Sequence, residues 1–289
     1  MTSPIAKLGL GSGQFSLDQP SSARGRPRDA EARDILSIAA RAGVSVLEVG
    51  RHSQGVELTM GQLIPKPNPF RLTVTTVRPD RGADFAEAEV RAQIARLGVD
   101  AVDAIFAPSA TDMLSPGGPA LWDRLRALKA QGLCRKIGVS VYASDDPVGL
   151  SRRFKPDVVQ APASLLDQRL LLDGSLAELA SMGVEVHLRS IFLNGVLFLP
   201  PDRAPSHLKA AAGRISRARR LIAEGRSDPL QAALGFALSR PEASAVLVDV
   251  ASAAEMSAVI AAAASPPPDL DWDEMALDDP TALDTWAAA

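Results

Sequence analysis

The stretch from Asp84 to Phe106, DFAEAEVRAQIARLGVDAVDAIF, shows the unit from which this chain is built. Apolar residues at helical spacing occupy 84–97, with Asp84 in a favourable capping position and Gly98 directly after the last turn. A mainly apolar run at 101–106 follows and predicts a buried strand. One helix followed by one buried strand is the repeat of a parallel sheet covered by helices.

The same alternation continues in both directions along the chain. We expect strands at 7–11, 44–49, 72–76, 101–106, 136–140, 157–160, 184–189 and 245–248. We expect helices at 29–42, 56–63, 84–97, 119–131, 145–153, 172–181 and 229–239. About eight such units in about 290 residues predict an α/β fold, the (β/α)8 TIM barrel. A doubly wound sheet is the alternative, but the glycine-rich residues 9–13 are not followed by a strong helix pattern.

Composition excludes several classes of protein. The 289 residues are 46% hydrophobic, which is too apolar for a disordered chain, and the net charge of -3 does not suit a dedicated nucleic-acid binder. No run of about 18 apolar residues predicts a membrane span, and residues 1–10 lack the features of a signal peptide. The single cysteine, Cys134, excludes an intramolecular disulfide. We expect a cytoplasmic protein that binds no nucleic acid and does not insert into membranes.

Two stretches interrupt the repeat within the predicted organisation. The barrel is expected at 1–264, with an Arg-rich insert at 198–226 that lies over the C-terminal mouth. An acidic tail, 265–289, follows three prolines and carries Trp272 and Trp286. The tail either packs against the barrel with its tryptophans as anchors, or serves as an acidic peptide for a partner.

Six short motifs, in this order, resemble those of the aldo-keto reductases. They are KLGLGSG at 7–13, AGVSVLE at 42–48, RLGVD at 96–100, RKIGVS at 135–140, VVQ with LLD between 158 and 167, and RSIFLNG at 189–195. The resemblance covers about residues 5–264. It implies the barrel fold and, in most members, reduction of carbonyls by a nicotinamide hydride with an Asp, Tyr, Lys and His tetrad.

All four tetrad positions are replaced in this chain. Glu48 stands for the aspartate, Ser53 for the tyrosine, Val77 for the lysine and Pro108 for the histidine. Hydride transfer to a carbonyl carbon leaves a developing alkoxide that needs a proton. A serine hydroxyl is a far weaker acid than a phenol, and valine and proline carry no proton. We therefore expect no catalytic residues and little or no reductase activity.

Other side chains could replace the lost acid. Tyr142 could be a relocated proton donor, and Glu48 with His52 could form an acid/base pair. The simpler interpretations are a loop tyrosine and a loop histidine beside a strand-end carboxylate. His187 is expected to pack in the barrel and His207 to face solvent. These histidines have no metal-ligand spacing, so no metal site is expected.

The nucleotide-contact positions of the family are better preserved. The implied cofactor-binding residues are Gly11, Ser12, Gly13, Ser140, Gln160, Arg189, Ser190, Phe192, Asn194, Gly195, Asp249 and Glu255. In the family, Gln160 and Ser140 would hold the nicotinamide amide, and Arg189 would stack on the ring. Members that prefer NADPH carry basic residues after strand eight, where Asp249 and Glu255 stand here. Acidic side chains there repel a 2'-phosphate, which predicts NAD(H) over NADP(H).

Three functions from different classes follow from these observations. One is an NAD(H)-binding regulator without turnover, another is an oxidoreductase with an unusual proton donor, and the last is a scaffold that binds no nucleotide. Resemblance to family members with altered tetrads implies cell-division and cell-fate control through FtsZ and the histidine kinase DivJ. It also implies recognition of Ala287–Ala289 by an ATP-dependent protease. The candidate partner surfaces are the acidic tail and the arginines Arg214, Arg217, Arg219 and Arg220.

Overall fold

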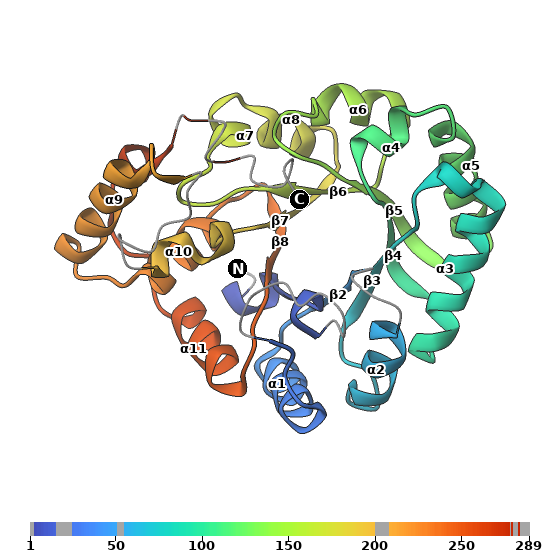
Figure 1. The fold of residues 1–289 in the computed structure, drawn as a ribbon, viewed down its shortest axis with the longest axis horizontal. Coiled ribbons are helices and arrows are strands. Elements are labelled where there is room, and N and C mark those ends of the chain that lie inside the picture. The colour runs from blue at the N-terminus through green and yellow to red at the C-terminus, as the bar shows by residue number, and fades with distance from the viewer. Residues whose placement is uncertain are drawn as a thin grey trace.

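The described residues of this computed structural model, 3–15, 25–50, 55–199, 208–277, 279 and 283, form a closed barrel of parallel strands (Figure 1). Neighbours in sequence are neighbours in the sheet, and β1 pairs with β8 to close it. The strands are β1 Leu8–Gly11, β2 Val46–Val49, β3 Arg71–Thr75, β4 Val102–Ala107, β5 Cys134–Ser140, β6 Val158–Pro162, β7 Glu185–Arg189 and β8 Ala243–Val248. The predicted (β/α)8 barrel is therefore confirmed.

Helices surround the strands on the outside of the barrel (Figure 1). The α-helices are α1 Asp29–Ala42, α2 Val56–Leu63, α3 Ala83–Leu97, α4 Ala110–Leu114, α5 Gly118–Ala130, α6 Pro147–Phe154, α7 Arg169–Leu172, α8 Ser175–Ser181, α9 Ala212–Glu224, α10 Pro229–Leu238 and α11 Ala253–Ala264. Short 3-10 helices are η1 Pro4–Lys7, η2 Gly13–Phe15, η3 Pro79–Arg81, η4 Leu193–Phe198 and η7 Asp273–Met275. α1 packs against α11, which closes the outer ring as β1 and β8 close the inner one.

One expected helix is wrong. The helix predicted at 172–181 begins later, as α8, while Leu172 ends a separate short helix, α7, and Asp173 and Gly174 lie between the two. Gly174 has φ 80°, a left-handed conformation that a continuous right-handed helix does not contain and that glycine adopts without strain. The chain therefore turns at this point rather than continuing one helix.

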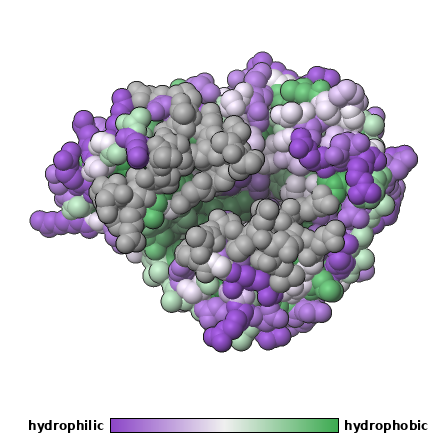
Figure 2. Space-filling view, in the orientation of Figure 1, coloured by the Kyte–Doolittle hydropathy of each residue, from purple (hydrophilic) through white to green (hydrophobic). Residues whose placement is uncertain are grey.

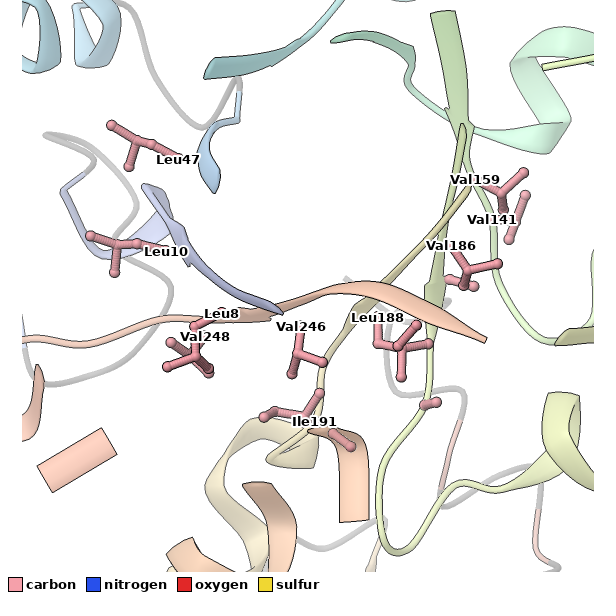
Figure 3. Close-up of a cluster of buried hydrophobic side chains, with 14 of the residues drawn as sticks. Leu8, Leu10, Leu47, Val141, Val159, Val186, Leu188, Ile191, Val246 and Val248 are labelled. Atoms are coloured by element: carbon pink, nitrogen blue, oxygen red, sulfur yellow. The ribbon is translucent and has the colours of Figure 1, made fainter. Parts of the chain in front are cut away.

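Alternating side chains on the strands divide the interior into two layers. Figure 3 shows Val159, Val186 and Leu188 on the outer side of their strands, where they pack toward the helices. Side chains alternate along a strand, so Gln160 and His187 face the inside of the barrel. The outer layer supplies most of the apolar core, while the inner layer also carries the polar groups of the site.

The Arg-rich insert contains α9, which the sequence did not predict. In Figure 1 α9 lies at the edge of the molecule beside α10. Arg219 of α9 donates to the carbonyl oxygens of Val196 at 2.6 Å and Leu197 at 3.2 Å, and also to that of Leu199. This arginine therefore holds the C-terminal end of η4. Residues 200–207 lie outside the described part, so the predicted position of the insert over the mouth stays a prediction.

The first part of the acidic tail packs on the barrel. Trp272 makes an edge contact with the Phe236 ring at 5.7 Å, and its carbonyl oxygen accepts a hydrogen bond from Gln168 Nε2 at 2.6 Å. The Leu277 amide donates to the Leu166 carbonyl at 2.8 Å. Trp272 is therefore an anchor, as one of the two interpretations expected. Trp286 and Ala287–Ala289 lie outside the described residues.

An ion pair also joins the tail and the insert. Arg217 of α9 pairs with Glu274 of η7 at 2.8 Å, so part of each candidate partner surface contacts the other. Among the described helices, none has the length and apolar character required to cross a bilayer.

Candidate nucleotide-binding site

The implied site residues gather where the parallel strands end. Figure 2 looks onto this region and shows an apolar hollow at the centre of the molecule. Ligand sites of (β/α)8 proteins occur at this C-terminal face, because the βα loops meet there. The C-terminal parts of β1, β5, β6 and β7 and the loops after β1, β7 and β8 supply the parts described below.

Ser140 and Gln160 form the best-defined polar contact of the site. They are register partners at the ends of β5 and β6, and Ser140 Oγ donates to Gln160 Oε1 at 3.2 Å. The hydrogen bond fixes the side-chain amide of a buried glutamine near the C-terminal end of β6. Two such groups can together pair with a small amide, which is what the nicotinamide carboxamide requires.

Arg189 lies beside this pair at the end of β7. Its Nη2 donates to the Val141 carbonyl at 2.8 Å, and its Cζ lies 4.8 Å from the centroid of the Tyr142 ring. Burial lowers the pKa of Arg189, and the nearby Tyr142, Glu48 and Asp145 act in the opposite direction. A planar guanidinium held by a carbonyl and a ring suits the predicted stacking against a nicotinamide.

The loop after β7 offers backbone groups to an anion. Ser190 has φ 59° and Gly195 φ 79°, both left-handed, so the chain turns sharply on either side of Ile191, which is buried. The Phe192 ring packs edge-on against Phe198 at 5.5 Å. Phosphate binding by turns of this kind depends on backbone N–H groups more than on side-chain identity. Asn194 is placed within η4, and its side chain is not described.

The turn after β1 is used partly for packing. Ser12 is fully buried, and its hydroxyl accepts a hydrogen bond from the Gly50 amide at 3.1 Å. Gly13 is buried as well and begins η2. A Cβ at Gly11 would collide with Asp249 Oδ1 and would lie 3.6 Å from Glu48 Oε2. Gly11 therefore makes room for the Asp249 carboxylate, and the Glu48 carboxylate lies near the same position, a proximity that the sequence did not predict.

The loop from β8 into α11 is organised by acids. The Ser252 hydroxyl caps α11 by accepting from the Glu255 amide at 3.1 Å, and Glu255 Oε2 accepts from the Ala251 amide at 2.8 Å. Glu31 of α1 reaches the same helix end, where its Oε1 accepts from the Ala253 amide at 2.6 Å. Carboxylates are stabilised at the positive end of a helix dipole. Glu31 is a site candidate that the sequence analysis missed, because it lies on a distant helix.

The described tetrad positions offer no proton donor of the usual kind. Glu48 is the third residue of β2, Val77 is buried beyond β3, and Pro108 follows β4. Ser53 lies outside the described residues, as does His52. Arg78, directly after Val77, is engaged with Asp112 on α4, with Arg78 Nε 2.9 Å from Asp112 Oδ1.

The remaining candidates are separate from one another. His187 is buried inside the barrel, whereas His207 lies outside the described residues. Cys134 is buried at the start of β5, and burial raises the pKa of its thiol to about 11, so it stays protonated at neutral pH. Within the described ranges, no group of three or more His, Cys, Asp or Glu side chains could hold a metal ion.

The sequence pattern of the Aldo/keto reductase family matches residues 7–276. The chain belongs to this family. A relative from Mycolicibacterium smegmatis (strain ATCC 700084 / mc(2)155), named an aldo-keto reductase, is 28% identical over 149 residues. That match covers 48% of this chain and 46% of the relative, so the chain spans about half the length of the relative it matches.

Solved structures of aldo-keto reductases share the fold. The holo form of AKR11C1 from Bacillus halodurans has a TM-score of 0.73 at 18% identity, over 93% of this chain and 89% of that one. An aldo-keto reductase structure from Pseudomonas aeruginosa has a TM-score of 0.66 at 17% identity, over 89% of each chain. At these identities the likeness concerns the fold alone.

Proposed function

We propose that this chain binds a nicotinamide dinucleotide at the mouth of the barrel and has little or no reductase activity. The observation that carries the proposal is the hydrogen-bonded pair Ser140 and Gln160, beside a fixed Arg189, at the C-terminal ends of β5 to β7. Bound there, a nicotinamide would supply a hydride. The described tetrad positions Glu48 and Val77 provide neither the phenol nor the amine that family reductases use to deliver the proton.

NAD(H) is the proposed nucleotide, in preference to NADP(H). Glu255 and Glu31 both place carboxylates on backbone amides at the start of α11. A 2'-phosphate brought to this helix end would meet negative charge, whereas a ribose hydroxyl can donate to a carboxylate. Asp249, which directly follows β8 and whose carboxylate lies over Gly11, is proposed as a further acidic residue at the adenosine end.

The proposed role is regulatory. The combination of an altered tetrad, nucleotide-contact residues and an alanine terminus resembles KidO, a cell-division regulator of Caulobacter-type bacteria. By that resemblance we propose FtsZ and the kinase DivJ as partners, and Ala287–Ala289 as a signal for an ATP-dependent protease. Retention of purified FtsZ or DivJ on the immobilised protein, with and without NADH, tests the partners. No retention of either would exclude them.

Calorimetric titration of NADH and NADPH into the purified protein tests nucleotide binding. An absorbance assay with a panel of aldehydes and quinones then tests turnover. Binding of NADH in preference to NADPH without oxidation supports the proposal. Absence of binding of both nucleotides would contradict it and favour a scaffold.

A second candidate function is an oxidoreductase with an unusual acid. It is favoured by the approach of the Glu48 and Asp249 carboxylates around Gly11, because two carboxylates close together can share a proton. Measurable NADH oxidation that is lost in Glu48→Gln would support this function. Oxidation unchanged by that substitution would remove Glu48 from the chemistry.

A further inference from the structure

Gln160 has a buried polar neighbour on the adjacent strand. Gln160 and His187 are register partners across β6 and β7, and register partners in a parallel sheet place their side chains on the same face. Their flanking residues Val159, Val186 and Leu188 lie on the outer side of the strands (Figure 3). His187 therefore faces the barrel interior next to the glutamine of the nucleotide site.

His187 is buried without satisfied hydrogen bonds. Its exposed fraction is 1%, and its ring centroid lies 5.9 Å from that of Phe106. Among the described residues, neither Nδ1 nor Nε2 of His187 has a hydrogen-bond partner. Buried polar groups are nearly always paired, because leaving one unpaired costs free energy. An imidazole with both nitrogens unpaired points to a partner that joins it in another state of the protein.

The amide of Gln160 can provide that partner. In this structure Ser140 Oγ donates to Gln160 Oε1, while an amide side chain offers two N–H donors as well as an oxygen. A neutral imidazole has one donor and one acceptor, so it can pair with either end of the amide. A carboxamide bound at the mouth would engage one end of Gln160 and leave the other end turned toward β7.

We propose that His187 is a positioning residue of the nucleotide site, which hydrogen-bonds the Gln160 amide when a nicotinamide carboxamide occupies the mouth. This inference rests on the nucleotide binding proposed above. His187 acts through Gln160 and therefore affects only the nicotinamide half of the ligand. The adenosine diphosphate half depends on the loop after β7 and on the start of α11, which lie elsewhere around the mouth.

Titration of NADH and of ADP-ribose, which lacks the nicotinamide, into wild type and two variants tests the inference. His187→Leu removes both hydrogen-bonding atoms, and we expect its affinity for NADH to fall about fivefold or more, the effect of losing one hydrogen bond. His187→Gln keeps a donor and an acceptor, and we expect its affinity to stay near that of wild type. Affinity for ADP-ribose should be the same in all three proteins.

Several results would overturn the inference. An unchanged NADH affinity in His187→Leu would exclude the positioning role while leaving the proposed function intact. An equal loss for NADH and ADP-ribose would indicate a general effect on the fold and would also exclude it. If wild type binds neither ligand, the proposed function itself fails and the inference fails with it.

A measurement on wild type covers the case in which His187→Leu does not fold. The ring nitrogens of His187 can be followed by nitrogen-15 NMR, with His187→Gln to assign them. We expect NADH to shift both resonances and ADP-ribose to leave them in place. If the resonances do not shift when the protein is saturated with NADH, the inference is overturned.

Discussion

At the scale of a single residue, the burial of His187 makes the stability of the protein depend on pH. The pKa of His187 is lowered to about 4, mainly by burial and also by the positive charges of Arg71 and Lys136, while Asp103 acts in the opposite direction. The unfolded chain has an ordinary histidine pKa near 6.5 and binds a proton as the pH falls through that value. The folded protein does not bind it until about pH 4, so acid favours unfolding across this window.

We therefore expect the free energy of unfolding to fall by about 2 kcal/mol between pH 7 and pH 5 through this histidine. Urea unfolding at both pH values measures it. In His187→Leu the difference between the two pH values should shrink by that amount, because the titrating group is gone. An equally steep pH dependence in the variant would assign the effect to other groups.

Some contacts of the candidate site could be predicted from the sequence, and others could not. Ser140 and Gln160 were expected together because both match nicotinamide-contact positions of the family, and they are register partners on β5 and β6. The Asp249 carboxylate lies over Gly11, across the β1–β8 seam, a contact that the sequence did not predict. Glu31 was not considered. Contacts of this kind join residues that are distant in the chain, and no local pattern encodes them.

At the scale of elements, periodicity determined what was predictable. All eight strands were expected where they lie, because each is a short apolar run, and α1 and α2 match their predicted bounds. α9 was missed because its segment was interpreted as an Arg-rich insert, although Ile215, Ala218 and Ile222 follow a helical spacing. The five residues of α4 are too few to show a helical period.

α9 stabilises η4 through one arginine. We expect Arg219→Ala to cost about 1–3 kcal/mol, because it removes charged donors from the carbonyl oxygens at the end of η4. It should also weaken nucleotide binding, since η4 continues the loop proposed to hold the phosphates. Arg217→Ala is the matched control on the same helix, because an exposed ion pair with Glu274 contributes little. Thermal unfolding and NADH titration distinguish the two, and equal effects would contradict this role of Arg219.

Removing a negative charge at the start of α11 should change the preference between NADH and NADPH. Glu31→Gln keeps an oxygen for the Ala253 amide but removes the negative charge. We expect the affinity for NADPH relative to NADH to rise about tenfold, because a 2'-phosphate no longer meets that carboxylate. Asp34→Asn, on the same helix and with the same change in net charge, should leave the ratio unchanged. Titration of both nucleotides measures it, and an unaltered ratio in Glu31→Gln would place the 2' position elsewhere.

At the scale of the whole molecule, the tail packs against the barrel at a position of α10 that carries no side chain, Gly235. A Cβ at Gly235 of α10 would lie 2.8 Å from Pro268 Cδ and 3.1 Å from Pro267 Cα. Neither proline can move far without displacing Trp272 from the Phe236 ring, since only a few residues separate them. Gly235 therefore allows the tail to pack closely against the barrel.

Alanine substitution at two helical glycines should therefore have opposite effects. Gly235→Ala is expected to lower the melting temperature despite the better helix propensity of alanine, because the new methyl group displaces the tail. Gly213→Ala in α9 meets no atom within 4 Å and should stabilise the protein by up to about 1 kcal/mol. Differential scanning calorimetry measures both. A rise in melting temperature for both variants would contradict the packing of Pro267 and Pro268 on α10.

The bonds from Gln168 to Trp272 and from Leu277 to Leu166 have a consequence for synthesis on the ribosome. The segment after β6 emerges long before the residues that complete its hydrogen bonds, and the β1–β8 seam also waits for the last strand. Domains fold as units during synthesis, and this barrel cannot close until the residues of β8 have left the exit tunnel. A nascent chain from which β8, Ala243–Val248, has not yet emerged would keep an open barrel and an exposed sheet edge.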